Sequence, residues 1–164
     1  MNYFQIRSFD VVNGKGIRTS IFVSGCTLHC KNCFNSEAWD FNSGKEFSSI
    51  QFFKIQELLK RPYCSGLSIL GGEPFDQHDF YFLIELCKAA HALKKDVWIW
   101  SGHQFEELRM NEDKLNLLKQ CDVLVDGPFI DEKKDLSLAW RGSQNQRIID
   151  VQKSLKQNEV VLYG

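Results

Sequence analysis

Four short hydrophobic runs recur along the chain, and each is followed by a turn of polar or glycine residues. The runs lack the alternation of apolar and polar positions that marks a strand with one face in water. They therefore predict parallel strands that are covered on both faces. The runs are residues 21–23, 67–70, 97–100 and 123–125, and the turns after them are residues 24–26, 71–73, 101–102 and 126–127.

Amphipathic segments separate these runs and predict helices at residues 48–60, 76–93 and 104–119. The first segment opens with the Ser-x-x-Gln pattern of a capping box, which marks a helix start. The pattern in the third segment is weaker and predicts two helical pieces with a break near Asn111.

The order of these elements predicts a single α/β domain over residues 1–164. Strand and helix alternate through the middle of the chain, which favours parallel strands joined by right-handed crossovers. Two more strand-like runs, residues 3–12 and 147–151, flank this region, whereas residues 152–164 carry no clear pattern. A length of 164 residues suits one domain with its own core.

The turns that follow the four hydrophobic runs hold the unusual residues of the chain. In barrels and in open α/β sheets, ligands bind at the carboxyl ends of the strands. The sequence therefore predicts that the four turns form one shared site.

Three cysteines in the first of these turns and the loop after it have metal-ligand spacing. Cys26, Cys30 and Cys33 form a C-x3-C-x2-C motif. A closed [4Fe-4S] cluster takes four cysteines, so three would leave one iron open to a substrate. The spacing by itself fits a zinc site equally well, with His29 or Cys64 as the fourth ligand.

The turn after the second run is Gly71-Gly72-Glu73-Pro74. Two glycines permit positive φ angles and a close approach of the backbone to a ligand. Glu73 offers a hydrogen-bond acceptor, and Pro74 stiffens the exit from the turn. Taken alone, the pattern is equally that of a tight turn with a solvated glutamate.

Together, the cysteine motif and the Gly-Gly-Glu turn resemble the radical S-adenosylmethionine (SAM) superfamily. Residues 24–35, 98–102, 122–129 and 140–147 extend this likeness to the family of anaerobic ribonucleoside-triphosphate reductase-activating proteins. The resemblance runs from about Phe4 to Val151. It implies an incomplete parallel β/α barrel of the radical SAM type, open on one side.

The resemblance also implies an oxidoreductase that activates another enzyme. A reduced [4Fe-4S] cluster would cleave SAM, and the 5′-deoxyadenosyl radical would take hydrogen from a glycine. That glycine would belong to the large subunit of an anaerobic (class III) ribonucleoside-triphosphate reductase. A flavodoxin-like protein is the implied electron donor.

The resemblance assigns roles to residues at the ends of the strands. Many radical SAM proteins place an aromatic residue against adenine at the position of Asn32, so Phe34 is the substitute in this chain. Ser101 would bond the ribose, and Asp126 would contact SAM or hold a loop. The cluster ligands would be Cys26, Cys30 and Cys33, and the residues on SAM would be Asn32, Cys33, Phe34, Gly71, Gly72, Glu73, Ser101 and Asp126.

Two other functions fit parts of the sequence. The same SAM chemistry would serve another target, either a formate-lyase-type glycyl-radical enzyme or a small substrate of a deazapurine pathway. A zinc-stabilised binding module without catalysis would explain the cysteines, but it would leave the Gly-Gly-Glu turn unexplained. The alternatives differ in the metal bound and in the molecule that receives the radical.

Composition narrows the setting in which the protein is expected to act. The formal net charge is -1, which does not favour a general binder of nucleic acid. The amino-terminal residues resemble no secretory signal, and no apolar run reaches the ~20 residues of a membrane span. We therefore expect a cytoplasmic protein, in which the six cysteines are ligands or core residues rather than a disulfide framework.

Overall fold

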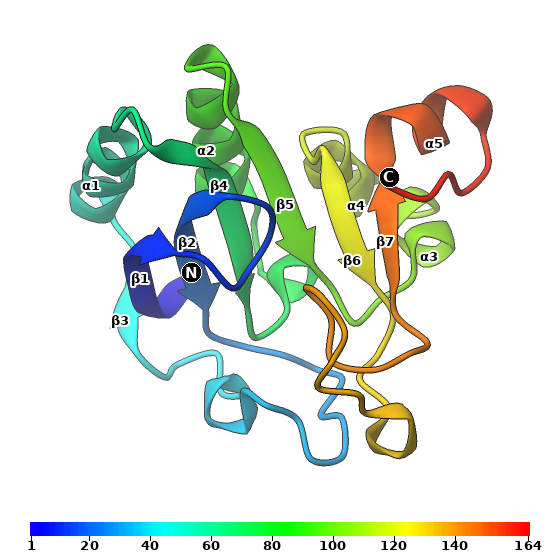
Figure 1. Ribbon diagram of the computed structural model, residues 1–164. Coiled ribbons are helices and arrows are strands. Elements are labelled where there is room, and N and C mark those ends of the chain that lie inside the picture. Colours follow the sequence, from blue (N-terminus) through cyan, green and yellow to red (C-terminus); the bar gives the residue numbers. More distant parts are fainter.

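The computed structural model of the protein describes all residues from 1 to 164 and is built around one seven-stranded sheet (Figure 1). Four neighbouring strands in its middle are parallel, and they contain the four hydrophobic runs, so this α/β prediction is confirmed. The strands are β1 (Asn2–Asp10), β2 (Ile17–Val23), β3 (Lys45–Glu46), β4 (Cys64–Gly71), β5 (Asp96–Trp100), β6 (Val123–Asp126) and β7 (Arg147–Asp150), in the order β3-β1-β2-β4-β5-β6-β7.

The outer strands of the sheet run antiparallel to their neighbours. β1 pairs with β2 and β3 in this way at one edge, and β7 pairs with β6 at the other. The sheet is therefore mixed rather than parallel throughout. The antiparallel pairing of β1 and β2 arises because a short loop, residues 11–16, joins them and no helix crosses between them.

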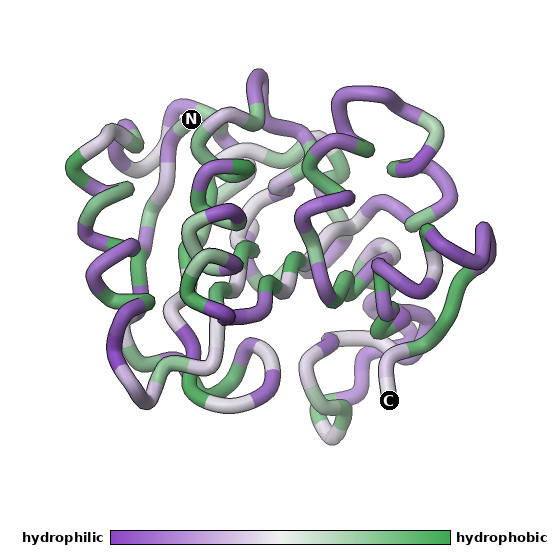
Figure 2. The backbone as a smooth tube through the Cα atoms, turned by 90° about the horizontal axis from the view of Figure 1, so that it is seen from above, coloured by the Kyte–Doolittle hydropathy of each residue, from purple (hydrophilic) through white to green (hydrophobic).

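Five α-helices and three short 3₁₀ turns complete the chain. Figure 2 shows hydrophobic and hydrophilic residues alternating along the coiled segments, as expected for helices with one buried face. The helices are α1 (Ser49–Leu59), α2 (Tyr81–Ala92), α3 (Phe105–Arg109), α4 (Glu112–Leu118) and α5 (Val151–Gln157), and the 3₁₀ turns are η1 (Ser36–Ala38), η2 (Pro74–Asp76) and η3 (Asp131–Lys133).

Helix boundaries follow local capping chemistry. The predicted capping box of α1 is present, with the Ser48 amide donating to Gln51 Oε1 at 2.8 Å. The predicted break near Asn111 is also present, because the Asn111 side chain accepts from the Lys114 amide at 3.0 Å and starts α4. None of the helices combines the length and hydrophobicity that a membrane span needs.

Three predicted boundaries were wrong. The helix expected from residue 76 begins at Tyr81, because Pro74–Asp76 forms a separate 3₁₀ turn. The last strand stops at Asp150, whose side chain accepts from the Lys153 amide at 3.1 Å and caps α5. The first strand ends at Asp10 rather than residue 12, because the Asp10 carboxylate accepts from the Val12 amide and turns the chain.

The two faces of the sheet differ in what covers them. On the helical face, Ile21, Ile69 and Ile99 belong to a core of 23 buried residues that includes the inner sides of the helices. On the opposite face, Trp98 packs in a separate cluster with residues of β6 and with Trp140. Loops cover this second face and leave room for a cavity at the carboxyl ends of the parallel strands.

Strand register brings the four carboxyl ends to one edge of the sheet. Val23 at the end of β2 pairs with Gly71 of β4, and Trp100 of β5 pairs with Val125 of β6. Two long loops, residues 24–44 and 127–146, extend from this edge, and Figure 1 shows them below the ends of β5 and β6. The candidate site lies between these loops and the strand ends.

Candidate functional site

The turns at the strand ends line one cavity of about 460 Å³. It lies at the edge where the four parallel strands stop, which is where the sequence predicts a shared site. Its walls come from β2, β4, β5 and β6 and from both long loops. Among the lining residues are the cysteine triad and the Gly-Gly-Glu turn: Cys26, Cys30, Cys33, Gly71, Gly72 and Glu73.

Glycine is required where the β2 and β4 turns meet. Gly71 has a φ of +110°, and a Cβ on Gly72 would collide with the carbonyl of Gly25. The Glu73 amide donates to the Gly25 carbonyl at 2.7 Å, and the Gly72 amide donates to Val23 at 2.7 Å. The two glycines therefore hold the Glu73 turn against the backbone that leads directly into Cys26.

All three cysteines of the motif are half-buried. Burial raises the pKa of the Cys26 and Cys30 thiols above the usual value, and backbone amides act against this shift. The Leu28 amide donates to Cys26 Sγ at 3.4 Å, and the Asn35 amide donates to Cys33 Sγ at the same distance. Amides that point at sulfur favour the thiolate, which is the form that binds metal.

Neither residue considered as a fourth zinc ligand joins the motif. Cys64 is buried at the amino end of β4, whereas Cys26 follows the carboxyl end of the parallel strand β2. His29 stacks on Trp39 with ring centroids 4.4 Å apart. No group of three or more His, Cys, Asp or Glu side chains is placed to hold a single metal ion.

Glu73 is 1% exposed, so the alternative of a solvated glutamate is wrong. Its Oε1 accepts from Ser101 Oγ at 2.7 Å and from the Gly102 amide at 2.6 Å. Its Oε2 accepts only from the Phe75 amide, at 3.2 Å. Burial raises the pKa of Glu73 to about 7, although the charge of His103 and the Ser101 hydroxyl lower it. The free acceptor capacity is therefore on Oε2.

Ser101 and Asp126 act mainly on protein groups in this geometry. The Ser101 hydroxyl lines the cavity but donates to Glu73. Asp126 is not among the lining residues, and it is fully buried. Its Oδ2 accepts from the Phe105 amide at 2.7 Å and from Arg147 Nη2 at 2.6 Å. Asp126 was predicted either to contact SAM or to hold a loop, and these contacts favour the second role.

The two residues considered for the adenine contact differ in position. Asn32 is exposed, lies outside the cavity lining, and donates to Asp131 Oδ2 at 3.0 Å. Phe34 lines the cavity and packs on Phe129 with ring centroids 4.8 Å apart. Of these two residues, Phe34 therefore lines the cavity and Asn32 does not.

Comparison with known proteins agrees with this site. The chain is 40% identical over 152 residues to the anaerobic ribonucleoside-triphosphate reductase-activating protein of Haemophilus influenzae, an alignment covering 90% of this chain and 97% of that protein. This chain belongs to that family. The Escherichia coli member is 38% identical over 150 residues (89% and 96%), and the Enterobacteria phage T4 member is 34% identical over 151 residues (90% and 93%).

Residues 12–149 of this activating-protein family member also match a family model described as a 4Fe-4S single cluster domain. The matched range includes the cysteine motif, the Gly-Gly-Glu turn and all four parallel strands. The resemblance predicted from the sequence is thus confirmed at the level of the family.

The sequence did not assign three of the side chains that line the cavity to this site. Arg7 comes from β1 to line the cavity, and Trp100 and Trp140 form part of its wall. Arg141 also lines it, and its Nε is buried without a hydrogen-bond partner, while its Nη1 donates to Gln146 at 2.6 Å. The sequence leaves open whether Arg141 and Arg147 bind the SAM carboxylate, the partner or neither. Arg147 pairs with Asp126 and lies outside the lining.

Proposed function

We propose that this protein uses a [4Fe-4S] cluster and SAM to generate a glycyl radical on the large subunit of an anaerobic ribonucleoside-triphosphate reductase. The observation that carries the proposal is that the cysteine triad and the Gly-Gly-Glu turn line the same cavity. The names of its relatives support the target, since they describe activation of that reductase. The protein would thus be a radical SAM oxidoreductase, with the sheet as an incomplete barrel in a single domain of residues 1–164.

Cys26, Cys30 and Cys33 are the proposed cluster ligands. The other three cysteines are buried in the core, so the motif has no fourth thiolate beside it. Three ligands suit a cluster with one iron open to substrate. When bound, the cluster supplies the electron that cleaves SAM and so leads to loss of a hydrogen atom from the reductase glycine.

The chain's own residues would hold and orient SAM. The amino group would lie against Gly71, Gly72 and the free face of Glu73 Oε2. The unpaired Nε of Arg141 suits the SAM carboxylate, because a buried guanidinium nitrogen without a partner favours an anionic acceptor.

The nucleoside end of SAM would lie along the loop that follows the cysteines. Phe34 offers the apolar surface for adenine, with Cys33 and Asn32 beside it. Ser101 would reach the ribose only if its hydroxyl turned from Glu73. Asp126 would act indirectly, because its carboxylate holds the start of α3 at Phe105 and the Arg147 side chain.

The partners belong to the same proposal. Both long loops line the cavity, so a glycine-bearing segment of the reductase would approach it past these loops. A flavodoxin-like electron donor and a cytoplasmic setting stay predictions from the sequence, as does the absence of nucleic-acid and membrane partners.

Anaerobic mixing with the reductase, SAM and a chemical reductant tests the proposal, with electron paramagnetic resonance as the readout. We expect a glycyl radical on the reductase with the unaltered protein and none with Cys30→Ala. Cys87→Ala is the matched control, because it removes a thiol from the core and should still give the radical. A radical on a formate-lyase-type enzyme alone, or a colourless protein that takes up zinc instead of iron, contradicts the proposal.

A further inference from the structure

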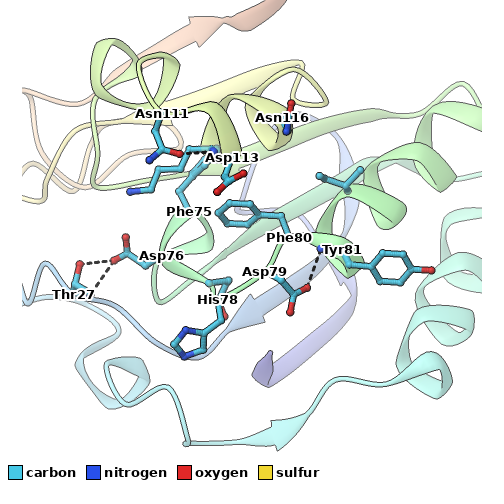
Figure 3. A pocket seen from close by; sticks show the side chains of 13 residues that line it. Thr27, Phe75, Asp76, His78, Asp79, Phe80, Tyr81, Asn111, Asp113 and Asn116 are labelled. Atoms are coloured by element: carbon cyan, nitrogen blue, oxygen red, sulfur yellow. Dashed lines mark hydrogen bonds between the residues drawn. The ribbon is translucent and has the colours of Figure 1, made fainter.

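Asp76 lies between the cysteine loop and the turn that follows β5. Its Oδ2 accepts from the Thr27 amide at 3.0 Å and from Thr27 Oγ1 at 2.6 Å, as Figure 3 shows. Its Oδ1 lies 2.7 Å from Nε2 of His103. One carboxylate therefore joins three segments that are far apart in the sequence: the cysteine loop, the η2 turn and the β5–α3 turn.

The cysteine loop has few other hydrogen bonds to the rest of the molecule. From Thr27 to Phe34 the one backbone–backbone hydrogen bond is internal, from the Cys33 amide to the Cys30 carbonyl at 3.1 Å. A side-chain hydrogen bond from Asn32 to Asp131 lies further along the loop, and it is solvent-exposed, as are the bonds of Thr27 to Asp76. The two hydrogen bonds between Thr27 and Asp76 are thus the main polar tether directly after Cys26.

Asp76 is itself held firmly. Its side chain is 6% exposed, and that of His103 is 16% exposed. The Asp76 amide donates to the Glu73 carbonyl at 3.1 Å, and the His103 amide donates to Ser101 Oγ at 3.0 Å. The tether therefore starts from the same two turns that hold the Glu73 carboxylate.

Charge strengthens these contacts. Burial by itself would raise the pKa of Asp76, but the hydrogen bonds from His103 and Thr27 outweigh it and lower the pKa to about 2. Asp76 is therefore ionised at neutral pH, and hydrogen bonds to an ionised acceptor are stronger than those to a neutral one. The side chain does not line the cavity of the cysteine triad, so it has no contact with a ligand there.

We propose that Asp76 is a positioning residue for Cys26, which it holds in place through Thr27, with His103 fixing the carboxylate from the other side. This inference rests on the proposed function, because it takes Cys26 as a cluster ligand. Asp76 would limit the motion of the loop before and during cluster binding, and it would keep Cys26 close to the Glu73 turn.

Hydrogen–deuterium exchange of the full-length, cluster-free chain measures the tether without any use of activity. In Asp76→Asn we expect the Thr27 amide, which donates to Asp76, to exchange about tenfold faster, the ratio expected for loss of one hydrogen bond to a charged group. Thr27→Val should give a smaller increase, since it removes the hydroxyl and keeps the amide. Thr27→Ser should behave as the unaltered protein.

Asp79→Asn is the matched control, because Asp79 lines a second pocket together with Thr27 and Asp76 and accepts only from the Tyr81 amide at 3.1 Å (Figure 3). Circular dichroism checks that each variant is folded. Thr27 is exposed, so Thr27→Val keeps the test valid if Asp76→Asn does not fold.

The spectrum of the reduced, reconstituted cluster is the second readout. We expect Asp76→Asn and Thr27→Val to change its electron paramagnetic resonance spectrum, and Thr27→Ser and Asp79→Asn to leave it unaltered. The inference is overturned if amide exchange is unchanged in both Asp76→Asn and Thr27→Val. It is also overturned if exchange is faster in these variants but the spectrum of their reduced cluster is unaltered. Failure of the proposed function looks different, because the unaltered protein would then take up no iron or fail to activate the reductase.

Discussion

The two oxygens of the Glu73 carboxylate differ in how fully protein donors engage them. Ser101 and Gly102 occupy Oε1, whereas Oε2 keeps room for another donor. Because burial raises the pKa of Glu73 to about 7, its carboxyl group titrates near neutral pH. A cationic amino group beside Oε2 would favour the ionised form.

Glu73→Gln should therefore weaken SAM binding by about tenfold or more, since it removes one hydrogen bond between charged groups. The cluster should still assemble, because the three cysteines are untouched. The measurement is a titration of the reduced, cluster-loaded protein with SAM, in which the electron paramagnetic resonance spectrum of the cluster reports binding. An affinity equal to that of the unaltered protein would show that Glu73 has no contact with SAM.

His103 gives the site a pH-dependent contribution to stability. The hydrogen bond to Asp76 raises the pKa of His103, more than burial lowers it, and Glu73 adds to the rise while Lys114 opposes it. Glu107 also faces the ring, at 3.6 Å from Nδ1. A raised pKa in the folded state means that the stabilisation is complete below about pH 6.5 and is lost as the pH rises through the folded value.

We accordingly expect His103→Gln to lower the melting temperature of the cluster-free protein more at pH 6 than at pH 9. Differential scanning calorimetry at the two pH values measures this difference. His78→Gln is the control, because His78 is exposed and has no carboxylate partner within ion-pair distance. An equal loss at both pH values would mean that the charge on His103 does not contribute.

At the scale of elements, local sequence determined most helix starts. Ser48 and Gln51 form both hydrogen bonds of the capping box on α1, and Asn111 divides the third helical segment as predicted. The start of α2 could not be predicted in the same way. There Glu73 caps a separate 3₁₀ turn, and its side chain is held in place by Ser101 from a different strand end.

Ser48→Ala should cost about 1 kcal/mol in the free energy of unfolding, the usual price of losing a helix amino-terminal cap. Urea denaturation of the cluster-free protein measures this cost. Iron uptake should be unaffected, because α1 packs on the helical face of the sheet and does not line the cavity. A loss of iron with no change in stability would contradict this separation of fold and site.

On the scale of the whole molecule, the fold and the cysteine loop are largely independent. The core of 23 buried residues joins the sheet to the helices, and none of the three motif cysteines belongs to it. The loop extends from the carboxyl edge of the sheet and contacts the second long loop, where Phe34 packs on Phe129 and Asn32 donates to Asp131. The protein should therefore fold without its metal centre, unlike small domains that need a metal to fold.

Removal of iron with a chelator under anaerobic conditions should thus leave the far-ultraviolet circular dichroism spectrum essentially unchanged, with cooperative thermal unfolding. Exchange of amide hydrogens should increase in residues 27–34 and stay slow in β4 and β5. Loss of cooperative unfolding on chelation would show that the metal centre is part of the core after all.

The sequence by itself determined the parallel strands, most of the helices, the cysteine motif and the Gly-Gly-Glu turn. These depend on hydrophobic period, capping residues and spacing, all of which are local. The antiparallel edges, the burial of Glu73, the engagement of Asp126 by Arg147 and the contacts of Asp76 were decided only by the tertiary structure. The antiparallel edges depend on which distant strands pair. The three carboxylate features depend on side chains from distant segments meeting at one edge of the sheet, and no local pattern records which partner a carboxylate will find there.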